Sequence, residues 1–313
     1  MSERGRDERL NWVDAVRGVG IVAVVAAHVW TRGTMRDAIY SFHMPLFFIL
    51  SGYLSVPRPP VAFARHLIPA MMRPYALFLL ALLAVDYLAE TAKGGRAIFH
   101  DWPADIVPVL IGGSALRGPF TIFWFVPCLL FARIAFNAAL ARWPDVRGRA
   151  WAVAIPVALA LAYGLGAITD WSPLGLLSAP MAFALLWAGA LFRRMGWRPM
   201  MAALLIPLSL CGLFLFPTIN MKAGDYGWPI MSIIGAGATS LLLMRACERL
   251  GRRAALIAPL GQAAMVVMYL HVAVIHHLTP YMGKVALFAV ALALPFAIDR
   301  LIRRSPLASR WLL

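Results

Sequence analysis

The chain has 313 residues, of which 62% are hydrophobic and only 14% charged, and its mean hydropathy is +0.76. Soluble domains are about 45–50% apolar and about 25% charged, so this composition excludes a soluble globular protein and indicates a polytopic membrane protein. The net charge of +15 would suit a nucleic-acid-binding protein, but the distribution of the basic residues along the chain argues against that class.

Apolar windows follow one another along the whole length, each about as long as the 17–25 residues that a membrane helix needs. No segment alternates between apolar and polar residues as the strands of a membrane barrel do. We therefore predict an all-α, polytopic helical bundle of about ten transmembrane helices, forming one domain over residues 1–313 without a soluble domain. The expected spans are roughly 13–31, 38–56, 70–89, 119–140, 151–169, 173–192, 200–217, 228–246, 256–278 and 283–302.

Lysine and arginine gather at alternate ends of these spans. They occur in the N-terminal arm, in the connections near residues 58–73, 142–149, 193–198 and 245–253, and in the C-terminal tail; the arm carries Arg4, Arg6 and Arg9. Cytoplasmic loops carry such an excess, so we expect both termini to be cytoplasmic in a protein of the cell inner (plasma) membrane. We interpret the excess of basic residues as setting the membrane topology and attracting anionic lipids of the bilayer. We expect no nucleic acid as a partner.

The first span contains two ionisable residues that an apolar helix rarely carries, Arg17 and His28. Eleven residues at about 100° each return to within roughly 20° of the starting direction, so both side chains lie on one stripe, about 16 Å apart along the axis. Such residues usually mark a site or a pathway. His28 is a candidate general base; a histidine that only bonds a neighbouring helix is an equally open interpretation. Asp14, three residues before Arg17, is a candidate ion-pair partner.

The second span supplies His43, followed by Pro45, and the small polar pair Ser51-Gly52. The connection between spans one and two is short, so the two form an antiparallel hairpin that brings His28 and His43 to a similar depth. Small residues such as Ser51 and Gly52 mainly permit close helix packing, and a chemical role for Ser51 is the alternative.

Further polar residues occur in later spans. Asp86 lies near the end of the third span, and Trp124 and His271 lie in the fourth and ninth. Arg65 and Arg73 at the start of the third span suit the phosphates of a nucleotide, with ordinary topology charges as the alternative. His276 and His277 are expected at the membrane interface. The external loop 90–118 is either an interfacial segment covering a site or a plain connector.

No metal centre is predicted. Cys128, Cys211 and Cys247 fall inside apolar spans at no metal-ligand spacing, and no pattern for zinc, haem or an iron–sulfur cluster is present. We expect no bound cofactor.

Several of these segments resemble the membrane acyltransferase-3 family. Arg17 and His28 match the arginine–histidine spacing of that family, and SFHMPLFFILSGYL resembles the second-span signature of its fucose 4-O-acetylase-like branch. FWFVPCLLF and LGQAAMVVMYLHVAV resemble later segments of the same branch. The resemblance is strong at the start of the chain and weak through residues 140–255.

The resemblance implies a membrane O-acyltransferase that moves an acyl group, most often acetyl, from acyl-CoA to a hydroxyl of an envelope carbohydrate. It implies that His28 is the catalytic histidine and Arg17 its partner, with His43 in the second motif. Asp14, Ser51, Asp86, Trp124 and His271 are then candidates for substrate binding. Arg65 and Arg73 are candidates for binding the acyl-CoA phosphates.

Two other classes remain open from the residues alone. A multi-pass transporter or flippase of a glycan or small metabolite would use the histidines and Asp86 as a proton relay. A non-catalytic membrane subunit of a glycan-assembly complex would use the histidines for packing. Substituting His28 separates these classes, because only the enzyme loses acyl transfer.

Overall fold

The computed structural model describes residues 3–313, and side chains from residue 11 onward. The side chains of Arg4, Arg6 and Arg9, expected at the cytoplasmic face, lie outside the described residues. The fold is helical, and residues 3–313 contain no β-strand beyond one isolated bridge between Asn220 and Asp225. The all-α prediction is confirmed.

The helices are, in chain order, α1 (Glu3–Val29), α2 (Thr34–Tyr40), α3 (His43–Tyr53), α4 (Pro60–Ala92), α5 (Ile106–Ile111), α6 (Phe125–Arg142), α7 (Arg149–Ile168), α8 (Ala179–Met195), α9 (Met200–Phe214), α10 (Met231–Arg249), α11 (Ala258–Gln262), α12 (Ala264–Leu278), α13 (Lys284–Arg304) and α14 (Pro306–Leu312). Short 3₁₀ helices join them: η1 (Gly113–Ala115), η2 (Gly118–Trp124), η3 (Pro173–Ser178), η4 (Met221–Ala223) and η5 (Gly251–Leu256).

Six helical stretches of the described chain are long and apolar enough to cross a membrane. They are Asn11–Val29, Pro60–Ala92, Gly118–Arg142, Arg149–Ile168, Pro173–Met195 and Lys284–Arg304, and two shorter apolar helices are α9 and α12. Each expected span coincides with a helix or with a broken pair of helices. The protein is therefore a helical membrane protein, while the total of about ten spans and the cytoplasmic termini stay predictions.

The helices divide into a central and a peripheral set. The apolar windows of α1, of η2 with α6, and of η3 with α8 are more than half buried, whereas those of α4, α7 and α13 are less than a third buried. Large apolar side chains cover the exposed faces, for example Leu80 on α4, Val153 on α7 and Val285 on α13. In a soluble protein such surfaces would cause association, but a bilayer covers them.

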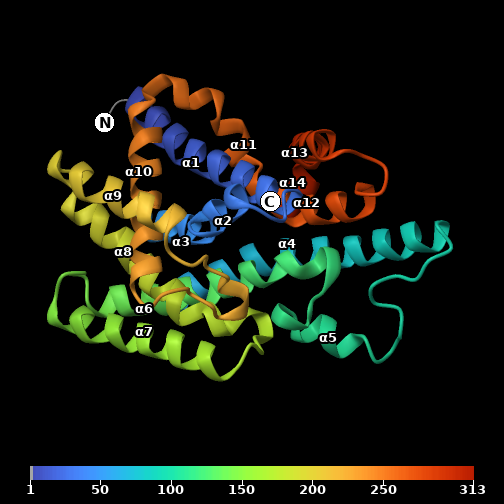
Figure 1. Ribbon diagram of the computed structural model, residues 1–313, viewed down its shortest axis with the longest axis horizontal. Helices are drawn as coiled ribbons and strands as arrows, with labels where there is room; N and C mark the ends of the chain where they lie inside the picture. Colours follow the sequence, from blue (N-terminus) through green and yellow to red (C-terminus); the bar gives the residue numbers. More distant parts are fainter. Residues whose placement is uncertain (1–2) are drawn as a thin grey trace.

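Close helix contacts hold the centre together. α3 packs on α8, and α1 packs on α11 and η5, while α4 extends beyond the rest of the bundle (Figure 1). A Cβ on Gly52 of α3 would collide with the backbone of Leu186 on α8, and a Cβ on Gly261 of α11 would collide with the backbone of Asp14 on α1. Gly52 therefore serves the close packing that the sequence indicated, and the second contact fixes the turn of α1 that carries Asp14 and Arg17.

The second and ninth expected spans are broken helices. Between α2 and α3 the chain leaves the helix at Ser41 and Phe42, and α3 begins again at His43 with Pro45 in its first turn. Proline suits the first turn of a helix because its missing N–H has no intrahelical partner there. Pro45 thus marks a helix start, and this start is what places His43 at the end of α3.

Candidate functional site

Three histidines from three helices meet at one end of the bundle centre. His28 is in the last turn of α1, His43 is the first residue of α3, and His271 is in the middle of α12. The ring centroids of His28 and His271 are 5.0 Å apart in an edge-to-face arrangement. Tyr40 links His28 to His43, with centroid distances of 6.3 and 4.9 Å. The hairpin proximity predicted for His28 and His43 is therefore present, and His271 joins them.

Each histidine ring is held in the same way by the backbone four residues earlier, which for His43 belongs to the preceding helix α2. The Nδ1 atom of each lies 2.8–2.9 Å from a backbone carbonyl oxygen four residues earlier; the pairs are His28 with Val24, His43 with Ile39, and His271 with Val267. A carbonyl oxygen can only accept, so Nδ1 carries the hydrogen in each neutral ring and Nε2 carries the lone pair. All three imidazoles are thus set in the tautomer whose Nε2 can accept a proton.

The three rings differ in access. His43 and His271 are buried, with relative exposures of 4% and 0%, whereas His28 is partly exposed. The Nε2 atom of His271 is buried and has no hydrogen-bond partner among the described residues. His28 is therefore the most accessible of the three rings, and His271 offers a buried acceptor beside it.

A positive charge lies beside the histidines on the α2 side. The Arg36 guanidinium stacks over the Tyr40 ring at 3.9 Å and bonds Asp37 at 2.9 Å. The hydrogen bond to Asp37 raises the pKa of Arg36 above its ordinary value. Arg36 stays protonated at any physiological pH and is within electrostatic range of His28.

An apolar cavity of about 370 Å³ leads from Arg17 toward the histidines. Arg17, Ile21 and Val24 line it, and with His28 they follow the i, i+4, i+7, i+11 stripe of one helix face. At its far end Val24, Met44 and Met268 line the wall, and each is within one helical turn of one of the histidines. Most other lining side chains are apolar; they include Phe47, Leu50, Leu54, Met71, Ile122, Phe125, Val126, Leu129 and Met265.

Arginines gather at the opposite end of this cavity. Arg17 bonds the Asp14 carboxylate at 2.9 Å, as the sequence predicted, and keeps 42% of its side chain exposed. Arg133 of α6 also lines the cavity, stacks over Phe63 at 5.8 Å, and is within electrostatic range of Arg17. No carboxylate pairs with Arg133 among residues 11–313, so this end of the cavity is positively charged.

A second connection brings Arg58 to the same place. The backbone N–H of Arg58 donates to Asn137 Oδ1 at 3.1 Å, and Asn137 Nδ2 donates to the Arg58 carbonyl at 3.0 Å. Asn137 is buried on α6, one helical turn after Arg133. Because this reciprocal pair fixes the segment before α4 against α6, Arg58 is also held within electrostatic range of Arg133.

The two arginines that the sequence favoured for phosphates are elsewhere. Arg65 and Arg73 are exposed on α4, and neither lines the cavity. Arg73 instead contributes to a second hollow against α14, where its guanidinium stacks over the Trp311 ring at 5.4 Å. The cavity arginines are thus Arg17 and Arg133.

Of the remaining residues that the sequence indicated, one lines the cavity and two do not. Ser51 lines the cavity, on the same helix as Gly52. Trp124 is buried in η2 but does not line the cavity. Asp86 lies at the far end of α4, where its Oδ2 accepts the backbone N–H of Ile98 at 2.8 Å. Asp86 therefore belongs to a different cluster from the three histidines.

The loop 90–118 is ordered and lies against the bundle. Ser114 and Ser172 exchange hydrogen bonds, and Lys222 donates to the carbonyl of Leu116 at 3.1 Å. Burial lowers the pKa of Lys222 below its ordinary value. Within the loop, α5 has no buried residue and exposes Val107 and Leu110, which is typical of a helix lying in the membrane interface.

Arg133 was not among the candidate residues that the sequence indicated. Its signal was an arginine in the middle of α6, two turns before the end of that helix and amid apolar residues. A basic residue at that depth faces the bundle interior or a cavity more often than lipid.

Apolar helices that meet the length and hydropathy of membrane spans, and a polar cluster inside them, define a helical membrane protein with an internal site. The family model described as an acyltransferase domain (the acyltransferase-3 family) matches residues 10–299, so the chain belongs to that family and is a membrane acyltransferase. No curated protein and no solved structure gives a match. The fucose 4-O-acetylase-like branch stays a prediction.

Proposed function

We propose that the protein transfers an acyl group, most simply acetyl, from acyl-CoA to a hydroxyl of an envelope carbohydrate. The observation that carries this proposal is a cavity with Arg17 and Arg133 at one end, whose other end is lined by side chains within one helical turn of the three clustered histidines. The distance along α1 from Arg17 to His28, about 16 Å, matches a pantetheine arm. The acceptor class rests on the resemblance of the first two spans.

The donor would lie along the cavity. Arg17 and Arg133, with Arg58 nearby, would hold the CoA phosphates, because guanidinium groups bind phosphate oxygens in a bidentate manner. The apolar wall formed by Met44, Phe47 and Phe125 suits the thin and mostly uncharged pantetheine chain. Arg65 and Arg73 would then lie outside the donor site, since neither lines the cavity.

His28 would act as the general base. Its Nδ1–H is directed to the Val24 carbonyl, so Nε2 can take the proton of an acceptor hydroxyl. The acceptor oxygen attacks the thioester carbonyl, and a C–O bond forms. The C–S bond then breaks, and the imidazolium returns its proton to the leaving thiolate. CoA and the O-acylated acceptor are the products, and no other reactant is needed.

His271 and His43 would position His28. The ring of His271 packs against the ring of His28, and its Nε2 has no hydrogen-bond partner among the described residues. This Nε2 would act as a hydrogen-bond acceptor that stabilises the imidazolium form of His28 during transfer. His43 fixes Tyr40 and thereby the α2 side of the cluster. Ser51 lines the cavity, and a covalent acyl-serine relay is the alternative route that a substitution can test.

The test uses purified protein in nanodiscs with acyl-labelled acyl-CoA and an envelope glycan fraction. His28→Ala should lose transfer by about 10²–10⁴-fold, the usual contribution of general acid–base catalysis, with normal protein levels. Arg142→Ala, an exposed arginine in the last turn of α6, is the matched control. Full transfer by His28→Ala would show that His28 is not the general base, and absence of transfer by purified wild type would favour a non-catalytic subunit in which the histidines serve packing. With the protein in sealed vesicles, glycan movement across the membrane without any labelled product would favour the transporter.

A further inference from the structure

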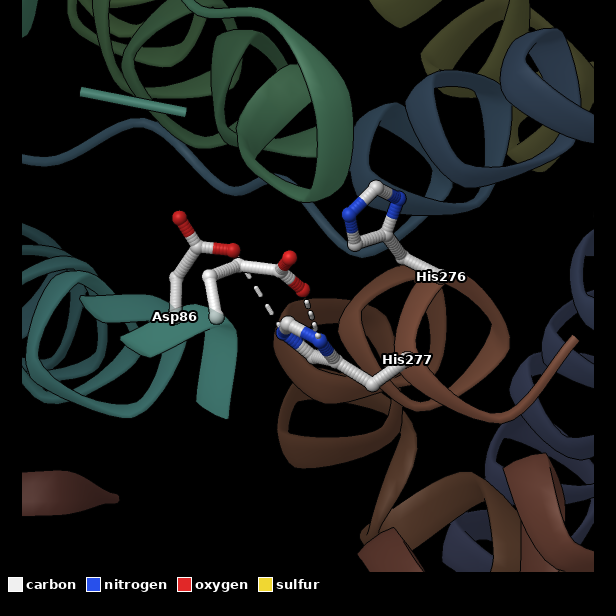
Figure 2. Close-up of side chains that lie close together, drawn as sticks. Asp86, His276 and His277 are labelled. Carbon is white, nitrogen blue, oxygen red and sulfur yellow. Dashed lines mark ion pairs between the residues drawn. The ribbon is translucent and has the colours of Figure 1, made fainter. Parts of the chain in front are cut away.

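A second polar cluster lies where the ends of α4 and α12 meet. It consists of Asp86, Glu90, His276 and His277, and we call it the α4–α12 cluster. Each residue offers one ligand-type atom, and these four atoms all lie within 4.8 Å of one another. Figure 2 shows the ring of His277 directed at the carboxylates, with His276 beside it on the same helix. None of these residues lines the cavity that leads to the three histidines.

The two helices hold these side chains by regular geometry. Asp86 and Glu90 are four residues apart on α4 and therefore share one face. His276 and His277 are in the last turn of α12. Stacked rings of Phe78 and Tyr269, 4.8 Å apart, pack the same two helices together further along.

His277 already contacts both carboxylates. Its Nε2 is 3.5 Å from Asp86 Oδ1, and its Nδ1 is 3.3 Å from Glu90 Oε1. His276 is exposed and next to it, with ring centroids 5.0 Å apart. An exposed side chain changes rotamer at little cost, so His276 can turn its ring toward the carboxylates.

The charges of the cluster do not balance. Lys93 Nζ pairs with Glu90 at 3.0 Å, but Asp86 is 1% exposed and its Oδ1 has no hydrogen-bond donor in the described chain. A buried carboxylate needs a compensating cation, since an unpaired charge costs several kcal/mol. The only basic group that contacts Asp86 among residues 11–313 is the imidazole of His277.

We propose that the α4–α12 cluster binds one divalent transition-metal ion, with Zn²⁺ as the best fit. Two imidazoles and two carboxylates are ligands that zinc takes at about 2.0–2.2 Å in a tetrahedron. Ligand atoms of such a tetrahedron are about 3.4 Å apart by that geometry, close to the 3.5 Å between His277 and Asp86. Magnesium and calcium are less suited, because they prefer oxygen ligands alone.

Lys93 is the competitor for this site. Its ammonium lies 3.0 Å from Glu90 and 3.4 Å from His277 Nδ1, on the exposed surface. A divalent ion would displace it into solvent, so Lys93 lowers the affinity of the site without blocking it. The sequence analysis predicted no metal centre, because the residues of the α4–α12 cluster come from two helices that are far apart along the chain.

Bound metal would fasten the end of α12 to α4. His271 is five residues before His276, about 8 Å along the helix axis, so the ion would steady the helix that carries the buried histidine. Asp86 also holds Ile98 in the loop 90–118. The inference is independent of the proposed acyl transfer, because its evidence is the cluster alone.

The test measures zinc in protein purified in detergent without a polyhistidine tag, after dialysis against zinc chloride. We expect about one zinc per chain in wild type and in the control His66→Ala, which changes an exposed histidine of α4. His276→Ala/His277→Ala should lose zinc, with affinity lower by more than about 10-fold. Zinc should also raise the melting temperature of wild type and of His66→Ala, but not that of the double variant. No zinc in wild type, or equal zinc in both variants, would overturn the proposal.

Two further variants keep the test decisive if the double variant does not fold. Lys93→Met should bind zinc more tightly than wild type, because the competing ammonium is gone. Asp86→Asn should weaken Co²⁺ binding and remove its tetrahedral absorption spectrum. If Lys93→Met binds no zinc and is only less stable, the cluster is an ion-pair network and the proposal is wrong.

Discussion

Removing the Arg133 guanidinium should weaken the binding of acyl-CoA without changing the chemical step. Arg133 lines the same cavity as Arg17, which lies about 16 Å along α1 from His28, and no carboxylate in the described chain pairs with Arg133. Arg133→Ala therefore removes a charge that a phosphate would otherwise meet, and leaves His28 untouched.

The magnitude follows from the exposure of the side chain. A hydrogen bond to a charged group contributes about 1.5–3 kcal/mol, and about 1.4 kcal/mol is a factor of ten. Because Arg133 is only half-buried, solvent screening favours the lower part of that range. We expect KM for acyl-CoA to rise about 10- to 30-fold, with kcat nearly constant, as for a group that binds the ground state and the transition state alike.

The assay is the initial rate of labelled acyl transfer in nanodiscs at varied acyl-CoA. Arg133→Lys should fall between wild type and alanine, because lysine keeps the charge but not the bidentate geometry. An acyl-pantetheine donor, which lacks the nucleotide phosphates, should show the same KM with wild type and with Arg133→Ala. Two results refute the reasoning: an unchanged KM for acyl-CoA, or an equal loss with acyl-pantetheine.

Three other substitutions test separate parts of the account. Gly52→Val should destabilise the fold by about 1–3 kcal/mol through overpacking, seen as a lower melting temperature in detergent, whereas Gly164→Val, which meets open space, should not. Asn137→Ala frees the backbone of Arg58 and should raise KM for acyl-CoA with kcat kept; a fall in kcat alone would contradict this. Ser51→Ala should keep most of the transfer activity, and complete loss would establish the acyl-serine relay instead.

The extent of the helices could be predicted from apolar length, because backbone groups in a bilayer must be satisfied within the segment. The breaks in the helices could not be predicted in this way. The gap before His43 and the path through η5 and α11 to α12 depend on tertiary packing, such as that of Gly261 on α1. Segment length and hydropathy carry no information about these contacts.

Part of the candidate site could likewise be predicted from the sequence, and part could not. The stripe from Arg17 to His28 follows from helical periodicity and is present as predicted. The meeting of His28 with His271 comes from tertiary packing, and spacing along the chain carries no information about it. Arg133 lies inside an expected span, but the sequence alone does not show whether such an arginine lines a cavity, and it does not separate Arg73 from a cavity arginine. Only the direction in which a helix face points separates such residues.

The most direct test of acyl transfer through His28 is the O-acyl content of envelope glycans, measured by NMR. Cells that lack the protein are restored with wild type, with His28→Ala, or with His66→Ala as the control, at equal protein levels. The account predicts that wild type and His66→Ala restore an O-acyl signal and that His28→Ala does not. An O-acyl signal restored equally by His28→Ala would contradict it.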